Sequence, residues 1–201
     1  DGKDMPETVS SEPLLVQGSG TNLLGPCEPM VFASDADDID FGAGLAVVSA
    51  DLPMGCASDR ALDGIRLLML CNAVNLRRWS SASHGTCVQG RPCAAFSPVA
   101  VTPDELGDLW SRGRSGPVSN KAVERKGGSE WPQGYSSIAE KRAMEQVQDG
   151  HAVTPYMRFG DTLRIEMKAR DGSSIFGAIA QEVVPAAGAK VSPALIAEQT
   201  P

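Results

Sequence analysis

Four aspartates stand close together in the first quarter of the chain. They are Asp35, Asp37, Asp38 and Asp40, and the segment that follows them, FGAGLAVVSAD, is mostly apolar. Carboxylate oxygens are the ligands that Mg²⁺ and Ca²⁺ prefer. Along an extended chain, alternation would place Asp38 and Asp40 on one face. The run therefore indicates either a site for a hard cation or a solvated turn that precedes a strand.

Other residue types that could carry chemistry are few. His84 and His151 are the only histidines. His84 falls in a predicted loop, where it could serve as a base or simply be solvated. Ser97 lacks a partner motif for a nucleophilic triad, so we expect it to cap a helix or stabilise a turn. The 5 cysteines include no CxxC pair, which favours reduced, mostly buried thiols over zinc or redox chemistry.

Composition limits the class of protein. A chain of 201 residues suits one domain with a real core. The net charge of −7 argues against a nucleic-acid surface, and no apolar run is long enough to span a bilayer. The chain begins at Asp1 without a signal-peptide pattern. We expect a fragment or trimmed product that is cytoplasmic and binds neither nucleic acid nor membrane.

The elements that must position these residues are clearest near the C-terminus. Apolar and polar residues alternate over 162–168, which predicts a half-buried strand. Asp171-Gly172 predicts a tight turn, and 174–184 predicts the returning strand of a hairpin. Past Val184 the chain is rich in Ala and Pro, so we expect a tail without regular structure over 186–201.

Helix signals occur at three places. Ser137 and Glu140 form a capping box before a helix that Gly150 would end. Thr102 and Glu105 form a second capping box. A third helix is predicted to begin at Ser58 and to run through Met69, on the spacing of its apolar residues.

Three stretches of the sequence resemble the bacterial fumarylacetoacetate hydrolase family. They are CAAFSPVAVTPDEL, SSIAEKRAMEQVQDG and YMRFGDTLRIEMKARDGSSIFGAIAQEVV. The resemblance covers most of 5–185, with a gap near 112–135. It implies a mixed α+β, strand-rich fold, a β-roll of mixed sheets with a few short helices and with some strands missing. We expect one incomplete catalytic domain over 1–185, the tail over 186–201, and pairing of two copies as a homodimer.

The resemblance also implies an activity and a cofactor. Family members hydrolyse a carbon–carbon bond in 1,3-dicarbonyl acids such as acylpyruvates, and a divalent ion, Mg²⁺ or Mn²⁺ or Ca²⁺, chelates the diketone oxygens. Two glutamates and an aspartate hold that ion in the family. The matching positions here are Gly42, Gly44 and Ala73. Only Asp38 and Asp40 remain as surrogate ligands, so the resemblance implies a metal site that has been lost.

Several residues that contact substrate in the family have counterparts here. The implied substrate-binding set, for a small anionic dicarbonyl acid, is Gln17, Arg77, Gln89, Arg91 and Ser119. Arg91 stands where a lysine is usual, and Pro117 replaces a threonine. Two functions are therefore compatible with the sequence. One is a family hydrolase with residual or altered activity, and the other is a catalytically inactive relative that acts as a binding or partner subunit.

Overall fold

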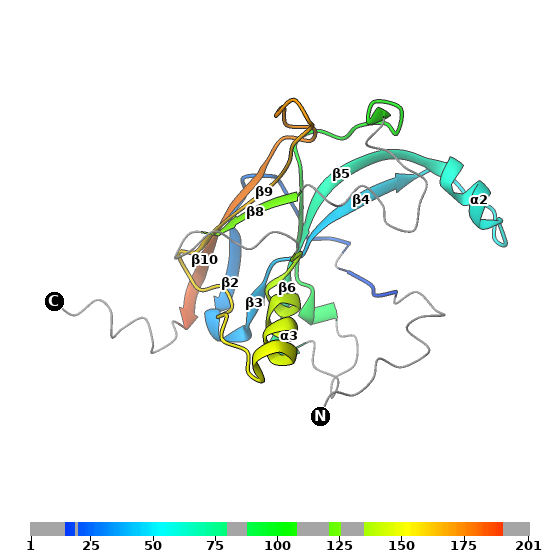
Figure 1. Ribbon diagram of the computed structural model, residues 1–201. Coiled ribbons are helices and arrows are strands. Elements are labelled where there is room, and N and C mark those ends of the chain that lie inside the picture. The colour runs from blue at the N-terminus through cyan, green and yellow to red at the C-terminus, as the bar shows by residue number, and fades with distance from the viewer. Residues whose placement is uncertain (1–14, 19, 80–87, 108–120, 126–134, 191–201) are drawn as a thin grey trace.

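The computed structural model describes residues 15–18, 20–79, 88–107, 121–125 and 135–190. Most of the regular structure in these residues is strand, arranged in two four-stranded sheets and one two-stranded ribbon (Figure 1). This confirms the predicted strand-rich α+β class. In the same part of the chain, none of the helices has the length and apolar content needed to cross a membrane.

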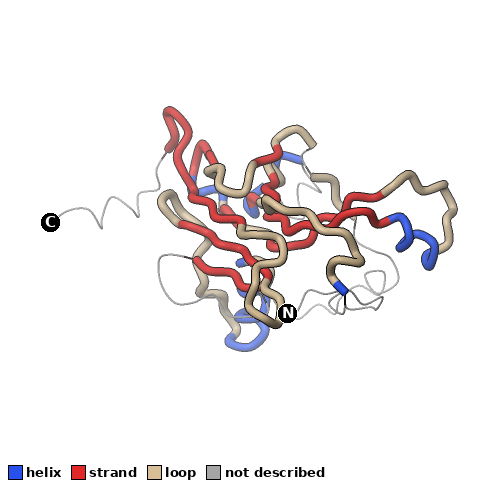
Figure 2. Tube along the Cα trace, turned by 90° about the horizontal axis from the view of Figure 1, so that it is seen from above, coloured by secondary structure: helices blue, strands red, loops and turns tan. Residues whose placement is uncertain are grey.

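Sheet A contains the strands that carry two of the three residues matched to the family's metal ligands, Gly44 and Ala73. Its order is β1 (Leu23–Leu24), β7 (Ala94–Phe96), β5 (Ile65–Ala73) and β4 (Ala43–Ser49). β4 and β7 both pair antiparallel with β5, whereas β1 pairs parallel with β7. The β4–β5 hairpin extends away from the other described elements toward α2 (Ser58–Ala61), as Figure 1 and Figure 2 show.

Sheet B joins the two ends of the described chain. Its order is β2 (Met30–Ser34), β10 (Ile179–Lys190), β9 (Thr162–Met167) and β8 (Lys121–Arg125). β2 and β10 run parallel, and the other pairs are antiparallel. A short ribbon of β3 (Ile39–Asp40) and β6 (Asn75–Leu76) completes the strands. In both sheets, strands that are far apart in the sequence therefore pair with each other.

Helices are few and mostly short. The longest is α3 (Ile138–Asp149), which lies below the ribbon of β3 and β6 in Figure 1. Single 3-10 turns are η1 (Asp35–Asp37), η2 (Leu62–Gly64), η3 (Arg77–Trp79) and η4 (Val88–Gly90).

The core contains aliphatic and aromatic side chains from both sheets and from α3. The largest fully buried side chains are Phe41, Phe176, Met30, Ile39, Leu68, Leu70, Ile138, Met157, Leu163, Ile165, Ile179 and Val74. Two buried side-chain amides, those of Asn72 and Gln181, are hydrogen-bonded to each other within this core. Asn72 Nδ2 on β5 donates to Gln181 Oε1 on β10 at 3.0 Å, and Asn72 Oδ1 accepts from the N–H of Gly42 at 3.1 Å. The amide pair links sheet A to sheet B.

The predicted C-terminal hairpin is confirmed, but its second strand begins at Ile179 instead of residue 174 and continues past Val184. Gly172 has φ +86°, as the turn requires, and Ile165 pairs with Ile179. The prediction that 186–201 lacks regular structure is wrong for 186–190, because β10 continues to Lys190, which pairs with Ser34 of β2. Pairing with β2 satisfies backbone groups that Ala-rich and Pro-rich composition alone would leave to water. Residues 191–201 lie outside the described residues.

The helix predicted from Ser58 to Met69 is wrong over most of its length. Only Ser58–Ala61 is α-helical, its N-cap is Ala57, and Ile65 already belongs to β5. Apolar residues occupy both faces of this segment, and such a run fits a buried strand as well as a helix. Pairing with β4 and β7 decides in favour of the strand.

The predicted caps around α3 are confirmed. Ser137 Oγ accepts from the N–H of Glu140, and Gly150 ends the helix with φ +76°. Thr102 and Glu105 also make their capping contact, with Thr102 N–H donating to Glu105 Oε2 at 2.8 Å, but turns rather than an α-helix follow.

Glu145 on α3 fixes the chain that leaves the helix, which gives a prediction for acid stability. Its carboxylate accepts from the Thr154 hydroxyl and from the N–H groups of Val153 and Thr154, and these bonds with Thr154 lower the pKa of Glu145 from 4.5 to about 2. A carboxyl whose pKa is lower in the folded state stabilises the fold above its unfolded pKa. We expect the free energy of unfolding to fall as pH drops from 5 toward 2, in the window between those two values.

Chemical denaturation of the Glu145→Gln variant at several pH values checks this. The variant should be less stable than the wild type at pH 7, and it should lose less stability between pH 5 and pH 2 because that carboxyl no longer titrates. Two parallel pH profiles would contradict the assignment.

Candidate functional site

Asp40 lies at the centre of the candidate site. Its carboxylate is fully buried and accepts from Arg77 Nε at 2.7 Å. The N–H groups of Ile138 and Ala139, in the first turn of α3, donate to the same carboxylate at 2.7 and 3.1 Å. Burial raises the pKa of Asp40, while Arg77 and the two N–H groups act in the opposite direction. Asp40 therefore connects η3, which begins at Arg77, to the positive end of α3.

The rest of the acidic run does not lie as a solvated extended segment. Asp35 is fully buried, and its backbone oxygen accepts from Arg158 at 2.6 Å. Asp38 has φ 56° in the left-handed region, so the alternation that would align it with Asp40 is broken. The expectation that both carboxylates share a face of an extended chain is wrong, because η1 and its left-handed cap turn the backbone. A metal-binding role for Asp38 and Asp40 stays a prediction.

The three positions matched to the family's metal ligands are neighbours, with Gly44 on β4, Ala73 on β5 and Gly42 directly before β4. Ala73 N–H donates to Gly42 O at 2.8 Å, and Gly44 pairs with Cys71 on the same strand as Ala73. A Cβ atom on Gly42 would lie 2.4 Å from Ala73 O, whereas one on Gly44 would lie 3.3 Å from Cys71 Sγ. The backbone at Gly42 thus lies too close to Ala73 for a side chain.

Asn75 connects these positions to Arg91. Asn75 Nδ2 donates to Ala73 O at 2.8 Å, and Asn75 Oδ1 accepts from Arg91 Nε at 3.3 Å. η3 and η4 are in contact, which brings Arg91 near Arg77. Burial and the neighbouring charge of Arg77 lower the pKa of Arg91. Arg77 is paired with the buried carboxylate of Asp40, whereas Arg91 is held by the neutral amide of Asn75, so the pair of guanidinium groups keeps an excess of positive charge.

Tyr156 also belongs to this site, although sequence reasoning did not single it out. Burial raises its pKa, and the charges of Arg142, Asp40, Asp38 and Arg77 act on its phenol, which places it within electrostatic reach of the site. The guanidinium of Arg142 lies 4.8 Å from the centre of its ring. The only sequence signal was its place at the start of the C-terminal family block.

The other predicted residues are less closely grouped. Gln17 and Gln89 are exposed. His151 is exposed beside the backbone oxygen of Asp149. Ser119, Pro117 and His84 lie outside the described residues. Of the predicted substrate-binding set, the structure brings together Arg77 and Arg91.

The thiols fit the predicted use of cysteine only in part. Cys93 is buried, and burial raises its pKa to about 11. Cys56 and Cys71 are half-buried, whereas Cys27 is exposed. The described cysteines form no disulfide.

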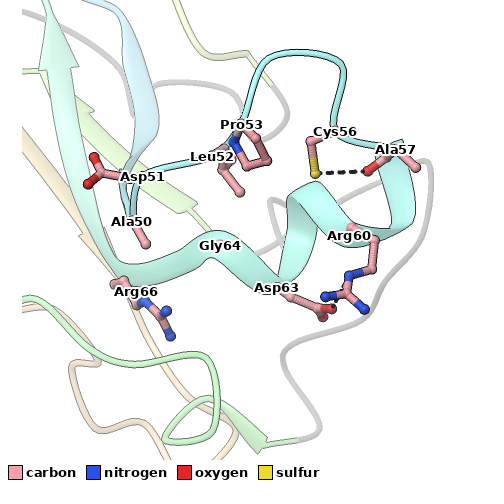
Figure 3. Close-up of a pocket in the computed structure, with 10 residues that line it drawn as sticks. All are labelled: Ala50, Asp51, Leu52, Pro53, Cys56, Ala57, Arg60, Asp63, Gly64 and Arg66. Carbon is pink, nitrogen blue, oxygen red and sulfur yellow. Dashed lines mark hydrogen bonds and ion pairs between the residues drawn. The ribbon is translucent and has the colours of Figure 1, made fainter.

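A separate cavity of about 490 Å³ lies at the tip of the β4–β5 hairpin (Figure 3). Its lining combines apolar side chains of the loop after β4 with two arginines and two aspartates. The lining residues are Ala50, Asp51, Leu52, Pro53, Cys56, Ala57, Arg60, Asp63, Gly64 and Arg66. None of the predicted site residues lines this cavity, so it is distinct from the Arg77–Arg91 site.

Comparisons with known proteins find a matching family model and similar folds. A family model described as fumarylacetoacetate (FAA) hydrolase C-terminal matches residues 1–130. Among the curated proteins, no match was found. Among solved structures, Cg1458 with inhibitor has a TM-score of 0.58 at 18% identity, and the match covers 89% of this chain and 70% of that one.

Two further solved structures have similar scores. The 2-hydroxyhepta-2,4-diene-1,7-dioate isomerase from Mycobacterium marinum has a TM-score of 0.52 at 16% identity, with 82% and 66% of the two chains covered. The fumarylacetoacetate hydrolase from the psychrophilic Exiguobacterium antarcticum has a TM-score of 0.52 at 17% identity, with 82% and 64% covered. This chain spans about two thirds of the length of these structures. At such identities the likeness shows the fold alone.

Proposed function

Because the chain belongs to the fumarylacetoacetate hydrolase C-terminal family, we propose that it binds a small dicarbonyl acid as a catalytically inactive relative. Two observations support this. The cationic pair Arg77 and Arg91 is present, and the ligand position at Gly42 is closed by the backbone of Ala73. The proposal keeps the ligand class of the family and gives up the metal-assisted reaction.

The residues present do not fit the family's divalent ion. Gly42, Gly44 and Ala73 supply no side-chain oxygen, and hard cations need several oxygen ligands. Asp40, the nearest carboxylate in the sequence, already accepts three hydrogen bonds from Arg77 and α3. Among the described residues no three His, Cys, Asp or Glu side chains are grouped as metal ligands would be. The donor set therefore gives no support for metal-dependent hydrolysis.

The charge of the site supports binding of an anion. Arg91 uses Nε for Asn75, and within the described residues its terminal nitrogens make no hydrogen bond. Such a guanidinium edge can hold a carboxylate through two parallel bonds. A bound carboxylate would also offset the repulsion between Arg91 and Arg77. The hydrogen bond from Arg91 Nε to Asn75 Oδ1 fixes the orientation of the Arg91 guanidinium.

The hydrolase function remains the alternative that the relatives favour. The solved structures with this fold include a hydrolase and an isomerase by their own names. Both activities act on acids with several carbonyl or carboxyl groups, which agrees with a retained anion site. The alternative needs a ligand set that the residues at positions 42, 44 and 73 do not supply.

Titration calorimetry with acetopyruvate, with and without Mg²⁺, tests the proposal. We expect saturable binding that Mg²⁺ does not change, and no release of pyruvate and acetate. Arg91→Ala should weaken the affinity at least about 10-fold, because one charge-assisted pair is lost. Arg170→Ala removes an exposed arginine in the C-terminal hairpin and is the matched control.

Two results would overturn the proposal. One is equal affinity of the wild type and the Arg91→Ala variant, which would place the ligand elsewhere. The other is Mg²⁺-dependent cleavage of acetopyruvate into acetate and pyruvate, which would restore the hydrolase function.

A further inference from the structure

The tip of the β4–β5 hairpin contains a cavity that is separate from the Arg77–Arg91 site (Figure 3). Its volume of about 490 Å³ lies in the range of small-molecule sites, which commonly measure about 300–1,000 Å³. Such sites are usually lined by apolar side chains and by a few polar groups that orient the ligand. The lining of this cavity therefore indicates which class of ligand would fit.

One wall of the cavity is apolar and is held in place by close packing. Leu52 lies directly against the backbone of Gly64, since a Cβ atom on Gly64 would lie 2.6 Å from Leu52 Cδ2. The N–H of Ala50 donates to Gly64 O at 2.8 Å, so the chain that leads to Leu52 is tied to the end of η2. Leu52 is nevertheless 43% exposed, and Pro53 next to it is also exposed. This wall is preformed and can still bury hydrocarbon from a ligand.

Arg66 adds a cation to the lining. Residues 65 and 67 pair with consecutive residues of β4, so Arg66 between them is the extra residue of a β-bulge. A bulge bends its strand and redirects a side chain, and bulges are frequent beside functional sites. Among the described residues, no carboxylate forms an ion pair with Arg66. The cavity thus has one cation whose charge no neighbouring side chain offsets.

The other charges of the lining favour an anionic ligand over a cationic one. Arg60 already faces Asp63, with Arg60 Nε 4.0 Å from Asp63 Oδ2. Asp51 is exposed, and Figure 3 shows its carboxylate turned away from the other lining side chains. An anionic group therefore meets the guanidinium of Arg66, which can bind a carboxylate through two parallel hydrogen bonds.

We propose that the cavity at the hairpin tip binds an amphipathic monocarboxylate, with its carboxylate on Arg66 and its hydrocarbon chain against Leu52 and Pro53. This ligand differs from the dicarbonyl acid of the Arg77–Arg91 site, because it has one charged group and an apolar body. Burial of the hydrocarbon drives binding. The guanidinium selects a carboxylate over a cationic head group.

Titration calorimetry with octanoate on the full chain tests this. We expect saturable binding of octanoate and at least about 5-fold weaker binding of octylamine, which has the same chain length and the opposite charge. Butyrate should also bind more weakly, because it buries less hydrocarbon. Saturating acetopyruvate should not displace octanoate, since the two sites are separate, and this result holds whether or not acetopyruvate itself binds.

Arg66→Ala should weaken the affinity for octanoate at least about 5-fold, because the charge-assisted pair is lost. Arg170→Ala removes another exposed arginine, in the C-terminal hairpin, and should leave the affinity unchanged. Circular dichroism shows whether Arg66→Ala remains folded. If it does not, the comparison of octanoate with octylamine on the wild type still tests the proposal.

Cys56 reports where octanoate binds, because its half-buried thiol lines the cavity. Octanoate should slow the alkylation of Cys56 by iodoacetamide, measured by peptide mapping, and should not slow that of Cys27, which is exposed outside the cavity. Equal affinity for octanoate and octylamine would overturn the proposal. The absence of saturable octanoate binding would do the same, and so would equal protection of the two thiols.

Discussion

Replacing Asp40 by alanine should lower the free energy of unfolding by about 3–5 kcal/mol, the usual cost of removing one partner of a buried ion pair. The variant would leave the guanidinium of Arg77 without its carboxylate, at a position where the Asp40 side chain is fully buried. It would also remove the acceptor for Ile138 N–H, which is buried. Since domains of this size have only about 5–15 kcal/mol of net stability, much of the fold would be at risk.

Urea denaturation followed by circular dichroism measures this difference. Asp51→Ala is the control, because Asp51 is an exposed aspartate near the hairpin tip and its replacement should change stability by less than about 0.5 kcal/mol. The double variant Asp40→Ala with Arg77→Ala should recover part of the loss, because no cation is then left unpaired. If Asp40→Ala and Asp51→Ala were equally stable, the contacts of Asp40 with Arg77 and α3 would not contribute to the free energy of unfolding.

Gly42→Ala should destabilise the chain by about 1–3 kcal/mol, although alanine is only one methyl group larger. The added Cβ would lie 2.4 Å from the carbonyl oxygen of Ala73, so one of the two backbones must move. Gly44→Ala is the internal control. Its Cβ would meet Cys71 Sγ at 3.3 Å, and that side chain can turn away.

Thermal denaturation of the two alanine variants distinguishes these cases. A melting temperature for Gly42→Ala that equals that of Gly44→Ala would show that the strands separate at little cost. The melting temperature of Gly42→Glu can be compared in the same way. This variant has the carboxylate that the family carries at this position, but its Cβ meets the same Ala73 oxygen. We expect this variant to be less stable than the wild type and to gain no affinity for Mg²⁺.

The sequence predicted those elements whose signals are local. The start and the end of α3 follow from Ser137, Glu140 and Gly150, which all contact the helix that they delimit. The hairpin of β9 and β10 follows from alternation and from one Gly turn. Each of these signals depends on residues close together in the chain, so no knowledge of the tertiary structure was needed.

Elements that depend on distant partners could not be predicted in this way. The segment that became β5 reads as helix until β4 and β7 are known to lie on either side. The last residues of β10 are strand only because β2 pairs with them. The amide pair of Asn72 and Gln181 joins residues that neither motif nor periodicity relates.

The candidate site was predicted in its residue types more than in its geometry. Arg77 and Arg91 came from the family resemblance, and the structure brings them together through η3 and η4. The roles of Asn75 and Tyr156 depend on contacts across the chain, so their residue types alone carry no signal. The close approach at Gly42 is a property of the backbone, which a side-chain comparison cannot show.

The position of β10 has a consequence for biosynthesis. β10 is the last described strand, yet it lies inside sheet B, between β2 near the start of the chain and β9. Among the described strands β2 pairs with β10 alone, so its backbone groups stay without that partner until the ribosome has made β10. Unpaired strands and apolar surface promote aggregation, so the interval before β10 is made is the one in which the nascent chain is most exposed to it. A stop codon shortly before Ile179 would remove the centre of a sheet, not a terminal extension.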